Sequence, residues 1–217
     1  MPRLMSFENV RTVQMIPSEL MRINDEIVVV PHSAAWTARF RIESQLLHVA
    51  LALLKPAIEH IGSTSVPGLA AKPIIDMLVG VESLTAFECQ SRRLALFGYQ
   101  YIPEYERALP DRRFFKRVVN GMRTHHVHVV EKNGVYWKRY LKFRNSLRDD
   151  AWMASRYAEL KRRLAARHSS DRDAYTNGKT GFIEAVLAMP PQAATSSTAA
   201  QPTRLITPLQ QPATMTA

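Results

Sequence analysis

The sequence predicts an α/β protein, a mixed sheet with helices, followed by a small helical module at its C-terminal side. Short apolar runs typical of strands alternate with amphipathic segments over about residues 26–132, whereas residues 135–188 show helical spacing. With 217 residues, 46% of them hydrophobic, the chain is long enough for one sizeable core plus such a module. We therefore expect one folded domain over residues 26–188, a poorly ordered extension over residues 1–25 and a disordered tail over residues 189–217.

Short apolar runs bounded by turn residues predict the strands. The run at residues 73–81 is rich in Ile and Val, as a strand buried on both faces would be. Pro31 ends the first strand, and the Asn120-Gly121 pair predicts a hairpin between the last two. The expected strands are residues 26–30, 57–61, 73–81, 99–102, 113–119 and 123–130.

Apolar residues at helical spacing predict the helices. We expect Thr37, Ser83 and Asp150 to act as N-caps, and Gly98 to end the second helix. The expected helices are residues 38–54, 83–97, a segment from Tyr136 onward, residues 151–167 and residues 171–188.

The composition favours an anionic ligand but does not choose one. A net charge of +10 and a pI near 10.0 favour nucleic acid, nucleotides or other phosphorylated molecules, and a solvated basic surface is the alternative. Cys89 is the single cysteine, which excludes an intramolecular disulfide and a zinc site built from cysteines. The first residues lack the apolar core of a signal peptide, and no run is long enough to span a bilayer. We expect a cytoplasmic protein with no membrane contact.

The stretch from His60 to Val81 is the first candidate site. Gly62, Ser63 and Thr64 form a small-residue turn that offers backbone N–H groups and hydroxyls to a phosphate. Asp76 interrupts the apolar strand that follows, where a carboxylate is costly to bury unless it is paired or bound to a cation. The alternative is a tight turn with Asp76 held by backbone N–H groups.

The histidines of the last expected strand are the second candidate. Because side chains alternate along a strand, His126 and His128 point to one face. Together with Asp76 they predict a site for one divalent ion, and this set of ligands suits zinc or a transition metal better than magnesium. Mg, Mn and Zn all stay open.

Basic residues on the strand before the histidines are the third candidate. Alternation places Arg113 and Arg117 on one face and Arg112 and Lys116 on the other, so one pair at most faces a shared cleft. Arg113, with Lys72 near the start of the Asp76 strand, is the expected phosphate clamp. A basic edge strand that discourages aggregation is the alternative.

These motifs together resemble the GrpB family, a group of bacterial proteins placed in the nucleotidyltransferase superfamily. The resemblance covers about residues 27–188 and includes VVVPHSAAWTARF, HIGSTSVPGLAAKPIIDMLVGV, RRFFKRV, HHVHVV and DRDAYTNGKTGFI. Family members typically carry an aromatic-Asp-Pro loop before the tryptophan, whereas this chain has His32-Ser33-Ala34-Ala35 there.

The resemblance implies a nucleotidyltransferase-like fold, in which a Gly-Ser turn opens the triphosphate site and a pair of carboxylates binds two metal ions. Gly62 and Ser63 match that turn, and Asp76 matches the first carboxylate. Leu78 stands at the second carboxylate position, so the usual two-metal arrangement is incomplete. From the strand order we infer that a histidine of the HHVHVV motif replaces an acidic ligand.

Three functions follow as hypotheses. The first is metal-dependent nucleotidyl or phosphoryl transfer from a nucleotide, or another phosphorylated small molecule, to an unknown acceptor. The second is a catalytically inactive nucleotide- or metal-binding module, motivated by Leu78, and the third is a basic adaptor for RNA or protein. For the first, the residues assigned to phosphate are Gly62, Ser63, Thr64, Lys72 and Arg113, and those assigned to metal and catalysis are Asp76, His126 and His128.

Overall fold

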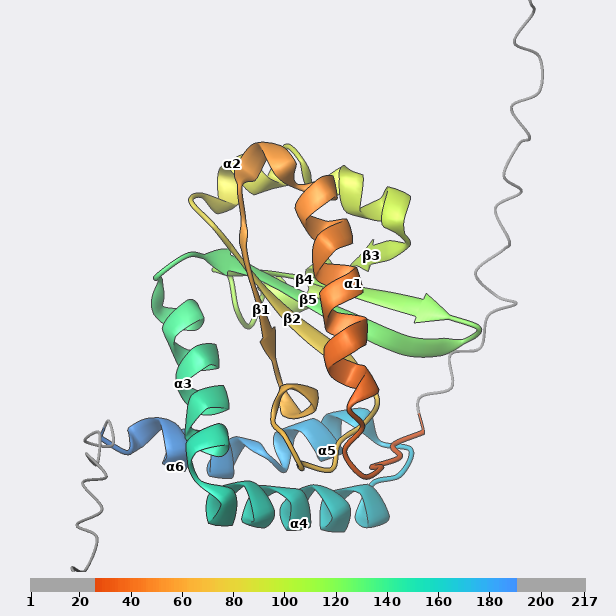
Figure 1. Ribbon diagram of the computed structural model, residues 1–217, viewed down its shortest axis with the longest axis vertical. Helices are drawn as coiled ribbons and strands as arrows, with labels where there is room; N and C mark the ends of the chain where they lie inside the picture. The colour runs from red at the N-terminus through yellow and green to blue at the C-terminus, as the bar shows by residue number, and fades with distance from the viewer. Residues whose placement is uncertain (1–25, 191–217) are drawn as a thin grey trace, which may run out of the picture.

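The computed structural model describes residues 26–190, so the predictions for residues 1–25 and for the tail beyond residue 190 concern residues outside that range. One sheet of five strands runs in the order β1-β2-β5-β4-β3, with β2 and β5 parallel and the other neighbours antiparallel (Figure 1). The strands are β1 (Ala57–Ile61), β2 (Ile75–Val81), β3 (Tyr99–Tyr101), β4 (Arg112–Val119) and β5 (Met122–Glu131). This confirms the predicted α/β mixed sheet.

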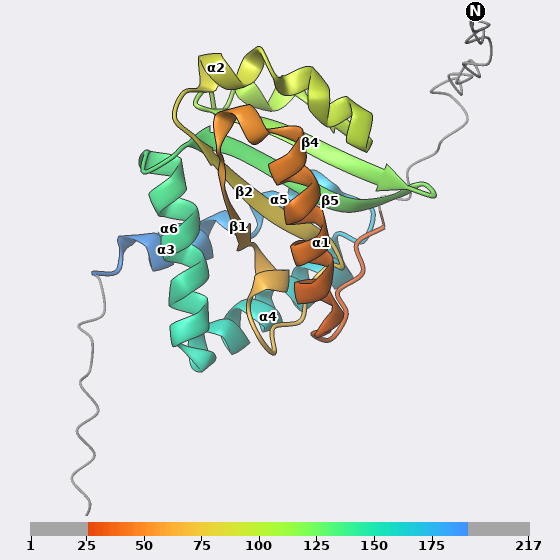
Figure 2. The same cartoon turned by 45° about the horizontal axis from the view of Figure 1, so that its top comes forward.

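Helices cover the two faces of the sheet differently (Figures 1 and 2). One face packs against α1 and against α2 with the turn that follows it, burying residues such as Met77, Phe115 and Val127. On the other face, α3 lies over one part of the sheet through Trp137, and α4, α5 and α6 gather at one end. The helices are α1 (Ala35–Ala50), α2 (Leu84–Glu88), α3 (Val135–Asp149), α4 (Ala151–Arg167), α5 (Arg172–Asn177) and α6 (Thr180–Ala188).

Several local predictions are confirmed. The backbone N–H of Ala86 donates to Ser83 Oγ, and that of Met153 donates to Asp150 Oδ1 at 2.8 Å, so both residues cap helices. Gly98 ends its segment at φ +79°, a left-handed conformation that favours glycine. Asn120 and Gly121, with φ of +51° and +72°, form the hairpin turn.

Three predicted elements are wrong. Residues 26–30 form no strand: only Val30 pairs, in a single bridge to Ala71, because the backbone N–H of Ile27 donates instead to the Ser169 carbonyl at 2.8 Å. The helix expected over residues 83–97 stops at Glu88, whose carbonyl accepts a bond from Ser91 Oγ, and a 3₁₀ segment replaces the rest.

The helix expected over residues 171–188 divides into α5 and α6 at Gly178. A Cβ at Gly178 would lie 2.5 Å from Leu164 Cδ2, so the absence of a side chain lets this junction pack against α4. The first helix also begins at Ala35, which leaves Thr37 inside it rather than at its N-cap. None of the described helices is long and apolar enough to cross a membrane.

Candidate functional site

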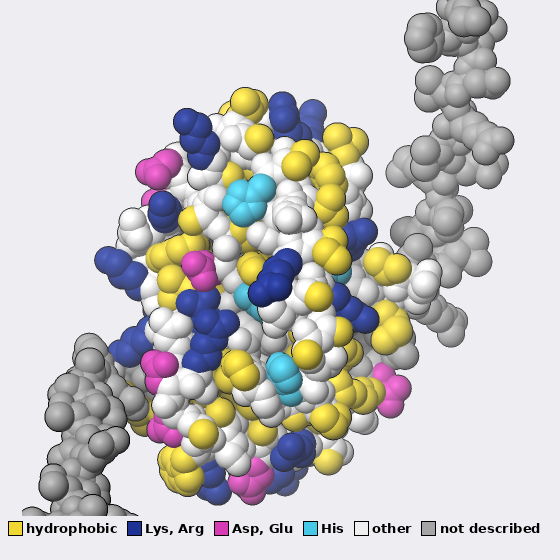
Figure 3. Space-filling model, in the orientation of Figure 1, with side chains coloured by type: hydrophobic (Ala, Val, Ile, Leu, Met, Phe, Trp, Pro, Cys, Tyr) yellow, Lys and Arg dark blue, Asp and Glu magenta, His cyan; other side chains and the backbone are white. Residues whose placement is uncertain are grey.

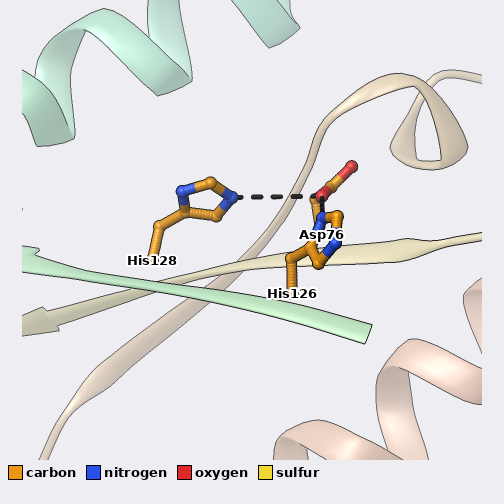
Figure 4. A group of neighbouring side chains, drawn as sticks. All are labelled: Asp76, His126 and His128. Carbon is orange, nitrogen blue, oxygen red and sulfur yellow. Dashed lines mark hydrogen bonds and ion pairs between the residues drawn. The ribbon is translucent and has the colours of Figure 1, made fainter. Parts of the chain in front are cut away.

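The sheet register brings Asp76, His126 and His128 together. Asp76 on β2 lies opposite His126 on β5, and His128 is two residues further along the same face. His126 Nδ1 lies 2.9 Å from Asp76 Oδ1, and His128 Nε2 lies 3.9 Å from the same oxygen (Figure 4). One ligand atom from each of the three lies within 4.8 Å of the others, so small side-chain shifts would bring all three within bonding distance of a single metal ion.

The charge states of this triad follow from its contacts. Burial acts to raise the pKa of Asp76, but the hydrogen bond from His126 and the nearby imidazole of His128 outweigh it and hold that pKa well below its usual range. The carboxylate is therefore ionised, and His126 Nδ1–H donates to it. Because that leaves His126 Nε2 as an acceptor, its burial without a hydrogen-bond partner marks an unused ligand atom.

A second set of contacts fixes His128. Arg112 Nη1 lies 3.2 Å from His128 Nδ1 and 3.1 Å from the Tyr140 hydroxyl, which is itself 3.2 Å from that nitrogen. A guanidinium only donates, so His128 Nδ1 accepts and its hydrogen lies on Nε2, towards Asp76. Burial, the largest cause, lowers the pKa of His128 to about 4, and the charge of Arg112 acts in the same direction.

The turn before β2 is shaped by Asp76. Gly62 has φ +68°, and a Cβ there would lie 2.3 Å from Asp76 Oδ2, so only glycine fits. The Thr64 hydroxyl donates to the Ile74 carbonyl and accepts from buried His60, 3.1 Å in each case. Thr64 thus secures the turn and has no hydroxyl hydrogen left for a phosphate, whereas Ser63 lines the pocket above it.

A pocket of about 540 Å³ lies over the triad. It includes six of the eight predicted site residues, namely Ser63, Thr64, Lys72, Asp76, His126 and His128, and Gly62 adjoins it. Five of the lining side chains are Lys or Arg and two are Asp, so the pocket is strongly basic. Anions are therefore the ligands that its electrostatics favours.

Arg113 is not brought to this site. It points to the opposite face of β4, where it pairs with Glu88 at 2.5 Å and Glu106 at 3.3 Å. The physical reason is strand alternation, which puts Arg112 rather than Arg113 on the face of His128. Arg112 lines the pocket and takes the place predicted for Arg113.

Leu78 shows why a second metal ion cannot bind as in the two-carboxylate arrangement. Its side chain is 0% exposed and packs with Ile61, Val130 and Trp137 beneath α3. The position expected for a second carboxylate is thus part of the hydrophobic core rather than of the pocket.

The sequence reasoning also missed residues that line the pocket. They include Arg123, Arg172, Tyr175 and Lys179. Three of these belong to the DRDAYTNGKTGFI motif, which had contributed only to the family resemblance. The sequence did offer one signal for these residues: within this motif, Arg172 and Lys179 lie on either side of Tyr175.

Comparison with known proteins identifies the family. The family model described as GrpB protein matches residues 26–189. The chain belongs to the GrpB family. It is 34% identical to the glutamate-rich protein GrpB of Alkalihalophilus pseudofirmus over 75% of this chain and 94% of that one.

Two solved structures extend this comparison. The crystal structure of GrpB from Enterococcus faecalis has a TM-score of 0.67 and 38% identity, covering 74% of this chain and 94% of that one. The Cid1 poly(U) polymerase gives a TM-score of 0.39 and 14% identity over 61% of this chain and 45% of that one, a likeness too remote to identify an activity. The names of the GrpB relatives state no reaction.

Proposed function

We propose that this protein binds a nucleotide, or another phosphorylated small molecule, together with one divalent ion and transfers a phosphoryl or nucleotidyl group to an acceptor. The observation that carries this proposal is the convergence of Asp76, His126 and His128 in a pocket lined by five Lys and Arg side chains. A carboxylate with two imidazoles suits zinc or manganese, and the basic walls suit phosphate.

The divalent ion and the phosphate group should each favour binding of the other. A dication alone would meet the repulsion of the basic pocket walls, whereas a phosphate alone would meet the charge of Asp76. A metal–phosphate complex satisfies both, and we therefore expect the two ligands to bind cooperatively. The bound ion would supply Lewis-acid stabilisation of the phosphoryl oxygens.

The residues of the chain have separate tasks in this proposal. Asp76, His126 and His128 hold the ion, and Ser63 offers its hydroxyl to a phosphate oxygen. Arg112 lies beside His128, where its guanidinium can neutralise charge that develops on the transferred group. Leu78 restricts the site to one ion, which limits the chemistry relative to a two-metal enzyme.

Thermal unfolding with ligands tests the proposal. ATP or GTP with Mn²⁺ or Zn²⁺ is expected to raise the Tm by more than the sum of the separate shifts, because binding to the native state stabilises it. Asp76→Asn should abolish the metal-dependent part of the shift. The matched control is Glu82→Gln, which removes an exposed carboxylate just after β2 and should behave as the wild type. A wild type that no metal or nucleotide stabilises would contradict the proposal.

A binding module without transfer is the second candidate. Buried Leu78, and the His128 hydrogen that lies on the nitrogen facing Asp76, both favour it. Incubation with radiolabelled nucleoside triphosphate and small phosphorylated acceptors separates the two, since bound but unaltered nucleotide supports the module. Both candidates place the protein in the cytoplasm, where nucleotides are available.

Dispersed charge on one face gives no support to the RNA adaptor. On the face drawn in Figure 3, acidic and apolar side chains separate most of the Lys and Arg side chains, and one small group of them lies together on the side of α3. An electrostatic footprint for nucleic acid would be continuous.

A further inference from the structure

One wall of the pocket, formed by the segment before β2 and by the α5–α6 region, combines an aromatic ring with basic side chains. Tyr175 on α5 is buried, and two ammonium groups lie against its ring, Lys72 Nζ at 5.0 Å and Lys179 Nζ at 4.3 Å from the centroid. Lys72 precedes β2, whereas Lys179 lies at the junction of α5 and α6. The fold thus brings two cations from distant parts of the chain onto one aromatic ring, an arrangement that stabilises cations through the ring quadrupole.

These two cations lack an anionic partner among residues 26–190. Neither forms an ion pair there, and Arg172 and Arg123 line the same pocket. Burial, and then the repulsion of Arg172 and Lys179, lowers the pKa of Lys72 to about 8. Burial likewise lowers the pKa of Lys179 to about 8. Two partly buried ammonium groups that share one aromatic ring and form no ion pair among residues 26–190 favour an anionic ligand.

We propose that Lys72, Arg172 and Lys179, arranged around Tyr175, form a second anion-binding subsite that takes a phosphate group of the acceptor. This inference deepens the proposed function and rests on it for the use of the pocket by a transfer reaction. It makes the acceptor itself a phosphorylated molecule, so the reaction would join two anionic substrates.

The geometry supports two subsites rather than one. Arg112, Asp76 and the two histidines occupy the β2–β5–β4 wall, whereas the three residues of the second subsite come from the segment before β2 and from the α5–α6 region. A pocket of about 540 Å³ lies within the range of sites that enclose whole small-molecule ligands. A polycationic acceptor would be repelled by the same wall.

Phosphate binding to the full-length protein tests this subsite without metal or nucleotide. Inorganic phosphate and glycerol 3-phosphate are titrated by calorimetry at constant ionic strength, against the wild type, Lys179→Gln and Lys72→Gln. Each substitution is expected to weaken phosphate binding about tenfold, the loss typical of one charge-assisted hydrogen bond. Lys138→Gln, an exposed lysine on α3, makes the same change in net charge and should leave binding unchanged. Tighter binding of glycerol 3-phosphate than of phosphate would identify an organic phosphate as the ligand.

The outcomes separate this inference from the proposed function. Equal phosphate affinity in wild type and both lysine variants would overturn it, since the binding would then be general screening of a basic protein. It would also be overturned if ATP with Mn²⁺ abolished phosphate binding, because one subsite would then serve both ligands. Failure of the nucleotide and metal shifts, with the lysine dependence intact, would refute the proposed transfer and leave the anion subsite standing.

Discussion

Two carboxylates, Glu43 and Asp76, lie on opposite faces of the sheet, each beside histidines of β5. Glu43 on α1 is 4% exposed and accepts hydrogen bonds from the Tyr99 hydroxyl at 2.8 Å and from Arg117 Nη1 at 2.7 and 2.9 Å. His125 Nε2 lies 3.9 Å away. This carboxylate has a full positive partner inside the protein.

Within residues 26–190, the ion-pair contacts of Asp76 are those with the imidazoles of His126 and His128. Its side chain is 26% exposed and lines the pocket. The Lys and Arg side chains of that pocket lie on its other walls. A charge neutralised by its own chain stabilises the fold, whereas one whose neutralisation is left to a ligand marks a binding site. The same strand, β5, therefore carries one histidine beside a structural carboxylate and two beside the carboxylate that we propose to be functional.

Removing the carboxylate of Glu43 should have the largest effect on stability. We expect Glu43→Ala to lower the free energy of unfolding by about 3–5 kcal/mol, because Arg117 and Tyr99 are left without their acceptor. Urea denaturation followed by circular dichroism measures this loss. The stabilisation by metal and nucleotide should persist at temperatures where the variant is folded.

Asp76→Asn in the same assay provides the contrast. We expect a loss of about 1 kcal/mol, since the amide keeps the shape and the site is partly open to water. If Asp76→Asn cost as much as Glu43→Ala, the two carboxylates would both be structural, and the comparison would fail.

Lys161 is an intermediate case, because among residues 26–190 this buried cation forms no ion pair with a carboxylate and does not line the pocket over the triad. It is 2% exposed, and its Nζ donates to the Ala70 carbonyl. Burial, with the nearby charges of Lys179 and Arg162, lowers the pKa of Lys161 from 10.5 to about 7. Below pH 7 the amine is charged in both states, and the full cost of burying the charge is present.

Between pH 7 and 10.5 the unfolded chain binds this proton and the folded chain does not, so the contribution of Lys161 to stability rises with pH. Lys161→Met should therefore stabilise the protein by about 2 kcal/mol at pH 6, with the gain vanishing towards pH 10. Thermal unfolding across this pH range measures the difference. Lys138→Met on the surface of α3 is the control and should show no pH-dependent gain. A variant less stable than the wild type at pH 6 would show that the Ala70 bond outweighs the burial cost.

Alternation and register explain what was predictable in the site. Residues 57–61 and 73–81 are apolar runs with clear ends, and a period of two fixes the common face of His126 and His128. Asp76 was identifiable because a carboxylate in such a run needs a partner. These are local properties, and the structure brings the three residues together.

The rest depended on long-range packing. Alternation allowed either Arg112 or Arg113 to face the site, and the register of β4 against β5, in which Phe114 lies opposite His128, decides that Arg112 does. Tyr175 and Lys179 line the pocket because α5 packs beside the segment before β2. About a hundred residues separate these two segments in the sequence, and hydrophobic periodicity does not predict contacts at that range.

A similarly small effect on stability is expected at Tyr140, which contacts both His128 and Arg112. Tyr140→Phe removes one hydroxyl and should lower the free energy of unfolding by about 1 kcal/mol. To bind a metal through Nε2, His128 must carry its hydrogen on Nδ1, where the Tyr140 oxygen is the acceptor and Arg112 offers none. The variant should therefore bind Mn²⁺ or Zn²⁺ about tenfold more weakly in a calorimetric titration.

Arg112→Gln should act in the opposite direction on the same equilibrium. Without the guanidinium, the His128 Nδ1 hydrogen is no longer disfavoured, and the amide oxygen offers a second acceptor. Metal affinity should then equal or exceed that of the wild type, while binding of the metal–nucleotide complex weakens because a phosphate partner is lost. If both variants lost metal affinity alike, Arg112 and Tyr140 would not act on the metal through the tautomer of His128, and this explanation would be wrong.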